Sequence, residues 1–524
     1  MRVAVVGALC AFCLSAGAAG AQTAPGGLAL PSAAPEPASV QITPLAPPPP
    51  ALAFTRELGV RSVAISPDGR HALAVVSLDG DQTALRILSL DVPGILPVQV
   101  TRPEVHIQDA WFLKNGHIAV EVATPITDGQ VRSWRRRLYF TDLAAEVWRE
   151  PLDTEFRRGA IDRPREWYWQ FAPVLLSALP TDPEWVVGMS TAPGEEGATF
   201  RYNLVTGGRE WLNRGASTYG GALGGAQYSG QKADLQGEMR ARREGKFDGG
   251  AVYDSIQLRL PGGGWDEHFR EFARDRSPIT VAAFDADPNI AWMVMRNGRD
   301  HLAVWRYDIA ARQLAPEPTY VDPLFDVVDV VQHRGINEYG RVLGYVVRAE
   351  RPRTVWTDPQ LEDIDRHARA ALRVERSPVQ WTDFESRITD LVDMSATGVD
   401  TRIVNWSDNF RNVLIEKSGP GAPPEYYILT FISGRSGSVL RPYGDAPPID
   451  RALLGAGSLT QYTTRDGAPL PVLVTRPNPN AYGPGPYPTI VMAHDGPQAR
   501  DDVAWDRLGR SQFWASRGYA VVQP

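Results

Sequence analysis

A pattern of short apolar runs that repeats along the chain constrains its fold more than any other feature of the sequence. In one copy, an apolar run ends at Ile65, a Ser66-Pro67-Asp68-Gly69 turn follows, and two further runs cover residues 71–76 and 85–91. Short runs rich in β-branched and aromatic residues, separated by Pro, Asp and Gly, are typical of β-strands joined by hairpins. Similar copies occur near residues 109–143, 174–207, 249–268, 281–314, 326–358 and 388–440, which makes seven approximate repeats.

The length and strand content of this repeat predict a β-propeller. A four-stranded sheet cannot bury both of its faces alone, whereas blades stacked radially around an axis cover one another. We therefore expect an all-β propeller of about seven blades over residues 53–457. The alternative fold for the same strands is a pair of β-sandwiches whose hairpins are similar by chance.

One segment inside this region departs from the β pattern. Between Thr357 and Arg373, a proline stands in the first turn and apolar residues recur at helical spacing on one face. These apolar residues are Leu361, Ile364, Ala368 and Leu372. The spacing predicts an amphipathic helix that packs outside the blades.

The N-terminus has the three parts of a secretory signal peptide. Arg2 is followed by an apolar run from Val3 to Leu14 and by Ala19-Gly20-Ala21, a small-x-small cleavage site. The run is shorter than a bilayer requires, which argues against a membrane anchor, and no later run is long and apolar enough to span a membrane. We therefore expect residues 1–21 to be removed and the protein to be exported, either to the periplasm or out of the cell.

The predicted signal peptide determines which cysteines remain in the mature chain. Both cysteines, Cys10 and Cys13, lie within the signal peptide. The mature chain is therefore expected to have no disulfide, no catalytic thiol and no cysteine-ligated metal.

Residues 22–52 are rich in Pro, Ala and Gly, a composition that predicts a spacer without a core of its own.

Charge and histidine spacing argue against two kinds of partner. The chain has 61 acidic and 54 basic residues and a net charge of −7, whereas a nucleic-acid-binding protein is expected to be basic. The eight histidines show no ligand spacing, so the sequence predicts no metal site and no cofactor.

The pattern changes near Ser458, where strands and a helix begin to alternate. Residues 461–467 and 470–475 predict two strands around an Asp-Gly turn, and the unbroken apolar run Thr489–Ala493 predicts a strand buried on both faces of an α/β sheet. A helix is expected next, followed by a strand over residues 519–522. The predicted buried face of this helix carries Trp505, Leu508, Phe513 and Trp514.

This C-terminal segment resembles the opening of the catalytic domain in the prolyl oligopeptidase family of serine peptidases. The resemblance rests on His494-Asp495-Gly496-Pro497, where the family usually has His-Gly-Gly-Pro, and on the segment from Phe513 to Pro524. It implies an α/β-hydrolase domain in which a serine on a Gly-x-Ser-x-Gly turn is followed by an aspartate and then a histidine. In the family all three follow the segment at which this chain ends. We therefore expect residues 458–524 to be a truncated α/β-hydrolase domain that contains no catalytic residue.

The resemblance also implies a function. It predicts an exported serine peptidase that hydrolyses short peptides through an acyl-enzyme, with peptides as its ligands. Because the triad is absent, the chain as given is predicted to be inactive. The alternative is a non-catalytic propeller module that binds a peptide or a protein partner.

The loop from His494 to Pro497 is the predicted part of the active site, because in the family this loop borders the site. Asp495 stands where the family has glycine, and a carboxylate close to a developing oxyanion would destabilise that charge. For His494 itself, the favoured interpretation is a strand-end histidine that hydrogen-bonds the loop.

Three other motifs have ordinary explanations. The segments 188–192 and 215–219 resemble a nucleophile turn around Ser190 and Ser217 but lack its last glycine, so they are interpreted as propeller strand or loop residues. Glu195-Glu196 resembles the amine-binding pair of some exopeptidases in the family, but a glycine on each side favours a solvated loop.

Overall fold

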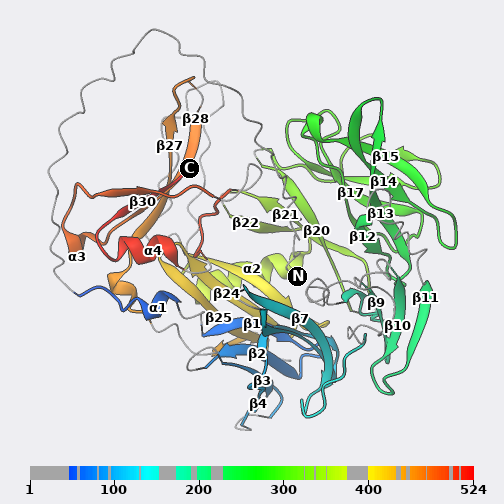
Figure 1. Cartoon of the computed structure of the whole chain (residues 1–524), viewed down its shortest axis with the longest axis horizontal. Helices are drawn as coiled ribbons and strands as arrows, with labels where there is room; N and C mark the ends of the chain where they lie inside the picture. Colours follow the sequence, from blue (N-terminus) through cyan, green and yellow to red (C-terminus); the bar gives the residue numbers. More distant parts are fainter. Residues whose placement is uncertain are drawn as a thin grey trace. The chain divides into compact units, whose positions relative to one another are not determined.

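A computed structural model describes most of the chain from residue 47 to the C-terminus, and Figure 1 shows its elements in sequence colours. The description leaves out residues 1–46, 56–58, 79–81, 93–95, 129–130, 153–172, 191–197, 214–227, 324, 336–337, 350, 375–398, 432–437, 444–448, 468, 495–499 and 507–508. The predicted signal peptide and most of the predicted spacer therefore lie outside the described residues. All described residues belong to one compact unit, Pro44–Pro524.

Antiparallel β-sheets dominate the described part of the chain, where seven of them follow one another in sequence. In each sheet, strands that are neighbours in sequence pair with each other. Sheet 1 contains β1 (Val60–Ile65), β2 (His71–Ser77), β3 (Thr83–Ser89) and β4 (Val98–Thr101). Sheet 2 contains β5 (His106–Lys114), β6 (His117–Asp128) and β7 (Val131–Asp142). Sheet 3 contains β8 (Val174–Ser177), β9 (Trp185–Met189), β10 (Thr199–Asn203) and β11 (Arg209–Asn213). Sheet 4 contains β12 (Tyr228–Ala233), β13 (Met239–Asp248), β14 (Ala251–Leu258) and β15 (Asp266–Phe272). Sheet 5 contains β16 (Thr280–Phe284), β17 (Ile290–Met295), β18 (Ala303–Asp308) and β19 (Gln313–Leu314). Sheet 6 contains β20 (Val327–Gln332), β21 (Val342–Arg348) and β22 (Pro352–Trp356), and sheet 7 contains β23 (Asp400–Trp406), β24 (Asn412–Gly419), β25 (Ala422–Phe431) and β26 (Ser438–Tyr443).

Each predicted repeat contains strands of one of these sheets, but the fourth sheet begins much earlier than its repeat. β12 starts at Tyr228, whereas the apolar pattern is first visible near residue 249. The reason is the composition of β13, whose charged side chains are paired across the sheet. Arg243, for example, lies 3.0 Å from Asp254 and 3.1 Å from Glu271. A strand stabilised in this way has no apolar periodicity by which the sequence could reveal it.

In all seven sheets the first strand carries a register shift against the second. Such a bulge inserts an unpaired residue, increases the local twist and re-aims the side chains beside it. The residues that follow the shift are Ser62, Asp109, Ser177, Lys232, Ala283, Asp329 and Asn405. Three of these side chains bond a neighbouring sheet. Ser62 Oγ accepts from Ala110 N at 3.2 Å, Asn405 Oδ1 accepts from Ile65 N at 2.8 Å, and Lys232 Nζ donates to the backbone oxygen of Ala282.

Each sheet packs against the next one along the chain. Shared clusters of buried residues join sheets 1 and 2, 2 and 3, 4 and 5, 5 and 6, and 6 and 7. Between sheets 3 and 4, Gly237 of the β12–β13 turn lies against Leu179 and Val187. A further cluster contains Leu414 from sheet 7 and Ala74 from sheet 1, so the succession of contacts returns to its starting point.

Helix α2 (Pro359–Ala371) confirms the amphipathic helix predicted from the sequence. Asp358 caps it, with a carboxylate oxygen 3.0 Å from the backbone nitrogen of Leu361, and a proline occupies the first turn. Its predicted apolar face lies in the core shared by sheets 6 and 7. The helix therefore covers the junction between these two sheets.

The last sheet, formed by residues after 455, has a different topology. It contains β27 (Ala456–Thr463), β28 (Pro469–Arg476), β29 (Thr489–Val491) and β30 (Ala520–Gln523), in the order β27-β28-β30-β29. β27 and β28 form the predicted hairpin, whereas β29 and β30 run parallel, with helix α4 (Arg510–Ala515) between them in sequence. The other described short elements are α1 (Leu52–Thr55), α3 (Pro479–Tyr482) and the 3₁₀ turns Ala273–Asp275 and Arg451–Leu453.

The prediction that Thr489–Ala493 forms a strand buried on both faces is wrong. β29 covers only Thr489–Val491, it lies at the edge of the sheet, and the Val491 side chain is 69% exposed. An apolar run indicates a buried strand where neighbouring elements cover both of its faces. Within the described residues, β29 pairs with β30 alone.

The predicted buried face of α4 is also wrong in part. Trp514 is 37% exposed, and Trp505 precedes the helix. Leu508 lies outside the described residues, and Phe513 is half-buried. The positions of α4 that are buried are Ser511, Gln512 and Ala515.

Gln512 is buried because its side-chain amide is fully engaged. Oε1 accepts a hydrogen bond from the backbone nitrogen of Gly455 at 2.8 Å, and Nε2 donates to the backbone oxygens of Pro420 at 2.8 Å and Gly455 at 3.1 Å. A buried polar group with its bonds satisfied does not carry the cost of an unpaired one. The amide thus connects α4 to the β24–β25 turn of sheet 7.

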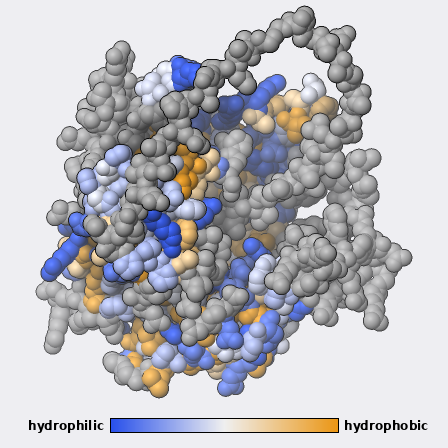
Figure 2. Space-filling view, turned by 60° about the vertical axis from the view of Figure 1, so that its left-hand side comes forward, coloured by the Kyte–Doolittle hydropathy of each residue, from blue (hydrophilic) through white to orange (hydrophobic). Residues whose placement is uncertain are grey.

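The described end of the proline-rich segment packs beside α4. Phe54 meets Phe513 edge to face, with ring centroids 5.6 Å apart, and Arg517 Nη2 donates to the backbone oxygen of Pro49 at 3.0 Å. No helix in the described part of the chain is both long and apolar enough to cross a membrane. On the face shown in Figure 2, hydrophobic residues lie scattered among hydrophilic ones.

Candidate functional site

The carboxyl edge of the parallel pair β29 and β30 is where the structure places the predicted site. Val491 pairs with Val522, and the backbone nitrogen of Met492 donates to the backbone oxygen of Val522 at 2.9 Å. His494 therefore follows β29 at the edge where Gln523 ends β30. In open α/β sheets, ligands bind outside the carboxyl ends of the strands.

His494 is half-buried at this edge. Its Nδ1 is buried, and no described residue forms a hydrogen bond with it. The other members of the predicted loop, Asp495, Gly496 and Pro497, lie outside the described residues, so the interpretation of His494 as a residue that hydrogen-bonds this loop stays a prediction.

Polar side chains that the sequence analysis did not single out fix the end of β30. Ser511 Oγ of α4 donates to Gln523 Oε1 at 2.9 Å, and Gln523 Nε2 donates to Asp501 Oδ2 at 2.8 Å. Asp506 accepts hydrogen bonds from the backbone nitrogens of Arg510 and Ser511 at 2.9 and 3.0 Å, which starts the helix. This network holds the end of β30 against the returning segment, which contains Asp501 and Asp506 and follows the predicted loop in sequence.

The returning segment also contacts sheet 6. Arg500 Nη2 donates to the backbone oxygen of Arg348 at 3.2 Å and to that of Ala349. Asp502 lies 3.6 Å from the Arg500 guanidinium, and burial raises the pKa of the Asp502 carboxyl although the arginines oppose this shift. Backbone acceptors of sheet 6 therefore anchor the segment on one side of the predicted site.

The nucleophile-like motif at Ser190 belongs to a sheet. Ser190 is fully buried at the end of β9, and its backbone nitrogen donates to the backbone oxygen of Ala198 at 2.8 Å. Gly188 lies against the Phe200 ring, so the glycine of this motif serves packing. The motif around Ser217 and the pair Glu195-Glu196 lie outside the described residues.

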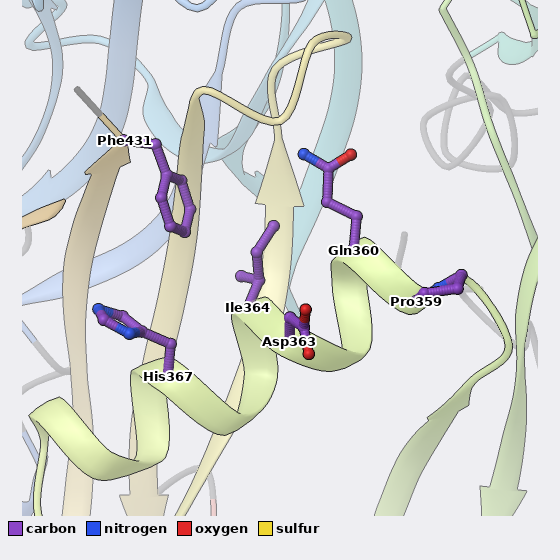
Figure 3. Close-up of a pocket in the computed structure, with 6 residues that line it drawn as sticks. All are labelled: Pro359, Gln360, Asp363, Ile364, His367 and Phe431. Atoms are coloured by element: carbon purple, nitrogen blue, oxygen red, sulfur yellow. The ribbon is translucent and has the colours of Figure 1, made fainter. Parts of the chain in front are cut away.

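Two surface cavities are lined by described residues. The first, of about 440 Å³, lies beside α2, with Ile364 and His367 on the side of the helix that faces Phe431 (Figure 3). The His367 and Phe431 rings are 6.2 Å apart. The second, of about 540 Å³, lies between sheets 5 and 6. Neither cavity is lined by a residue of the predicted loop.

Nowhere among the described residues do three or more His, Cys, Asp or Glu side chains come together as a group that could hold a metal ion.

Comparison with known proteins gives a fold but no close relative. No protein-family model matches the chain, and no curated protein matches it. Among solved structures, prolyl oligopeptidase B from Galerina marginata bound to a 35mer hydrolysis and macrocyclization substrate has a TM-score of 0.52 and 9% identity, over 90% of this chain and 62% of that one. The same enzyme bound to a 25mer macrocyclization substrate has a TM-score of 0.51 and 10% identity, over 90% and 63% of the two chains. A Mycobacterium tuberculosis puromycin-hydrolyzing peptidase has a TM-score of 0.49 and 15% identity, over 91% and 68%.

The fold of the described residues follows from these findings. The described residues form a mostly β, propeller-type structure of many antiparallel sheets with few helices. This is the fold of a prolyl oligopeptidase-family peptidase, which confirms the resemblance predicted from the C-terminal segment. The chain spans 62–63% of the length of the Galerina marginata enzyme.

Proposed function

We propose that this chain comprises the propeller and the first part of the α/β-hydrolase domain of an exported serine peptidase that hydrolyses short peptides. The proposed parts are a signal peptide at residues 1–21, a spacer at 22–52, a propeller at 53–457 and part of an α/β-hydrolase domain at 458–524. The observation that carries the proposal is the succession of antiparallel sheets followed by a sheet with a parallel β29–α4–β30 unit, in a chain with this fold.

Two observations support a propeller with seven blades. The sheet contacts run from sheet 1 to sheet 7 and return to sheet 1, which is the packing that radial repetition requires. The bulge in the first strand also recurs in each of sheets 1 to 7. A pair of β-sandwiches accounts for neither observation.

The β29–α4–β30 unit supports an α/β-hydrolase domain. A parallel pair needs a crossover connection, usually a helix, and α4 lies within this connection. His494 then stands at the edge where such sheets carry their sites. We infer that the loop from His494 to Pro497 borders the active site of the peptidase.

Catalysis requires a nucleophile that this sequence does not supply in recognisable form. The sequence contains no Gly-x-Ser-x-Gly segment, and Asp495 stands where the family has glycine beside the oxyanion. We therefore infer that the chain on its own hydrolyses no peptide. Peptides are the proposed ligands because the chain shares its fold with a prolyl oligopeptidase that was solved with 25mer and 35mer substrates.

Two measurements test the proposal. The chain should not react with a fluorophosphonate probe, and covalent labelling of any serine in it would contradict its inferred inactivity. The intact mass of the protein isolated from its source should exceed that of residues 22–524 by an α/β remainder with a Gly-x-Ser-x-Gly segment. A mass equal to that of residues 22–524 would overturn the peptidase proposal and favour the non-catalytic binding module.

A further inference from the structure

The hairpin of β13 and β14 in sheet 4 ends in a mostly exposed apolar pair. Phe247 and Val252 face each other across the hairpin, and their side chains are 72% and 67% exposed. Lys246 and Asp248 alternate with Phe247 and therefore point to the opposite face, where Arg270 lies 3.2 Å from Asp248. The hairpin tip is thus apolar on one face and charged on the other, and its apolar face is a candidate contact surface.

The apolar face of the hairpin turns toward sheet 5 but extends past it. Nearer the core, Ile256 on the same face packs in the cluster that sheets 4 and 5 share. Arg243 Nη2 donates to the backbone oxygen of Ile279 at 2.7 Å, immediately before β16 begins. Residues 244–248 of β13 continue beyond this bond, so sheet 5 does not cover the pair at the tip.

The end of the sheets at which this tip lies can be deduced from contacts between turns. Gly340 of the β20–β21 turn lies against Leu235 of the β12–β13 turn, and Gly335 of the same β20–β21 turn lies against Asp408 of the β23–β24 turn. The turns between first and second strands of sheets 4, 6 and 7 therefore share one end. The turns between second and third strands, which include the β13–β14 tip, share the opposite end.

The C-terminal segment contacts the end that carries the tip. Arg500 donates to the backbone oxygen of Ala349 in the β21–β22 turn of sheet 6. Gln512 Nε2 donates to the backbone oxygen of Pro420 in the β24–β25 turn of sheet 7 at 2.8 Å. Both turns connect a second strand to a third strand, as the β13–β14 tip does in sheet 4.

These contacts also give the direction in which the interface extends. Gly457 of β27 lies against Pro420 of sheet 7, whereas Arg500, which follows β29 in sequence, reaches sheet 6. Among the described residues β29 is the edge of its sheet, and Val491 there is 69% exposed. A strand added beside β29 would continue this succession away from sheet 7 and toward sheets 5 and 4.

We propose that the Phe247–Val252 pair is a docking surface for the part of the α/β-hydrolase domain that follows β30. The inference rests on the proposed function, because it requires that part of the domain. The partner is an apolar face of the domain, and the contact continues the interface that sheets 6 and 7 already form with the C-terminal segment. Burial of the two side chains would help to fix the domain against the propeller.

Hydrogen exchange followed by mass spectrometry tests this contact in the intact protein isolated from its source and in the chain of residues 22–524. We expect the amides of residues 246–253 to exchange about tenfold more slowly in the longer protein, because docking suppresses local opening. Residues 234–238, the turn at the other end of sheet 4, are the internal control and should exchange alike in both proteins. Equal exchange of the tip in both proteins would overturn the proposal. Protection that is already present in the chain alone and is lost on dilution would identify a second copy as the occupant and would overturn it as well.

Two matched variants locate the surface. With Phe247→Ser the tip should exchange alike in the longer protein and in the chain, because the apolar contact is lost. Leu96→Ser removes a side chain that is 86% exposed in the β3–β4 connection of sheet 1, and it should leave the tenfold difference intact. A tip that stays protected in the longer protein with Phe247→Ser would contradict the docking surface alone. An intact mass equal to that of residues 22–524 would instead overturn the proposed function, and this inference with it, before any exchange is measured.

Discussion

The side-chain nitrogen of Asn412 donates a hydrogen bond to the backbone oxygen of Gly69 at 2.7 Å and so joins the seventh sheet to the first. Gly69 has a φ of +73°, and a Cβ there would lie 2.8 Å from the Cβ of Ser407, so this turn requires glycine. Asn412 is 3% exposed, and its Oδ1 accepts from Thr430 Oγ1 at 2.6 Å. Among the described residues each sheet contains only strands that are consecutive in sequence, so side chains and turns make this connection there.

Asn412→Ala is therefore expected to lower the free energy of unfolding by about 1–3 kcal/mol, because the Gly69 oxygen would stay buried without its donor. Thermal unfolding followed by circular dichroism measures the change. Asn480→Ala, at an exposed position of α3, is the matched control and should leave the midpoint unaltered. Equal midpoints for the two variants would contradict a role of Asn412 in joining the sheets.

Gly188→Ala should destabilise the chain by about 1–3 kcal/mol through overpacking. A Cβ at Gly188 would lie 2.5 Å from the Phe200 ring. Adding Phe200→Leu should restore part of the loss, since the smaller side chain leaves room for the methyl group. Gly116→Ala, where a Cβ meets nothing within 4 Å, is the control for the glycine-to-alanine change itself. Additive losses in the double variant would show that the Phe200 contact is not the cause.

Gln512→Ala should loosen the contact between α4 and sheet 7. Three hydrogen bonds link this amide to Gly455 and Pro420, and removal of a buried partner costs about 1–3 kcal/mol. Hydrogen exchange followed by mass spectrometry should show faster exchange of the Gly455 amide. Arg510→Ala, at an exposed position of the same helix, should leave this exchange rate unchanged. Faster exchange in both variants would indicate a general loss of helix α4 instead.

The sequence predicted those parts of the fold in which apolar spacing determines the structure. The helix at residues 357–373 was predicted because its apolar face is its buried face, and the β27–β28 hairpin because a turn separates two apolar strands. β12 and β13 were missed because ion pairs such as Arg243 with Asp254 replace the apolar pattern. The bulges of the first strands depend on how two strands pair, and no periodicity of a single strand reveals such pairing.

In the candidate site, too, the sequence predicted local features and missed those that depend on distant contacts. His494 and its loop were predicted from a motif, whose spacing is local in sequence. Gln512 and Gln523 were missed because their partners lie far away in sequence, Pro420 and Asp501 among them. A glutamine that bonds distant backbone groups looks from the sequence like a solvated residue. The exposed Trp514 was predicted as buried for the complementary reason, since its apolar character says nothing about which element covers it.

The pH dependence of stability should reveal the lowered pKa of His268. Burial, assisted by Arg312, lowers the pKa of this imidazole from its ordinary value of 6.5 to about 4, and His268 Nδ1 lies 2.8 Å from the Tyr307 hydroxyl. Between pH 6.5 and pH 4 the unfolded chain therefore binds a proton that the folded chain does not, so stability falls as the pH is lowered through this range. Above pH 6.5 the residue contributes no pH dependence, because the imidazole is neutral in both states. His268→Gln has no such titration. As the pH is lowered from 6.5 to 4, the unfolding midpoint of the parent chain should therefore fall more than that of the variant. A difference between the two midpoints that stays constant over this range would show that His268 is protonated as easily in the folded chain as in the unfolded one.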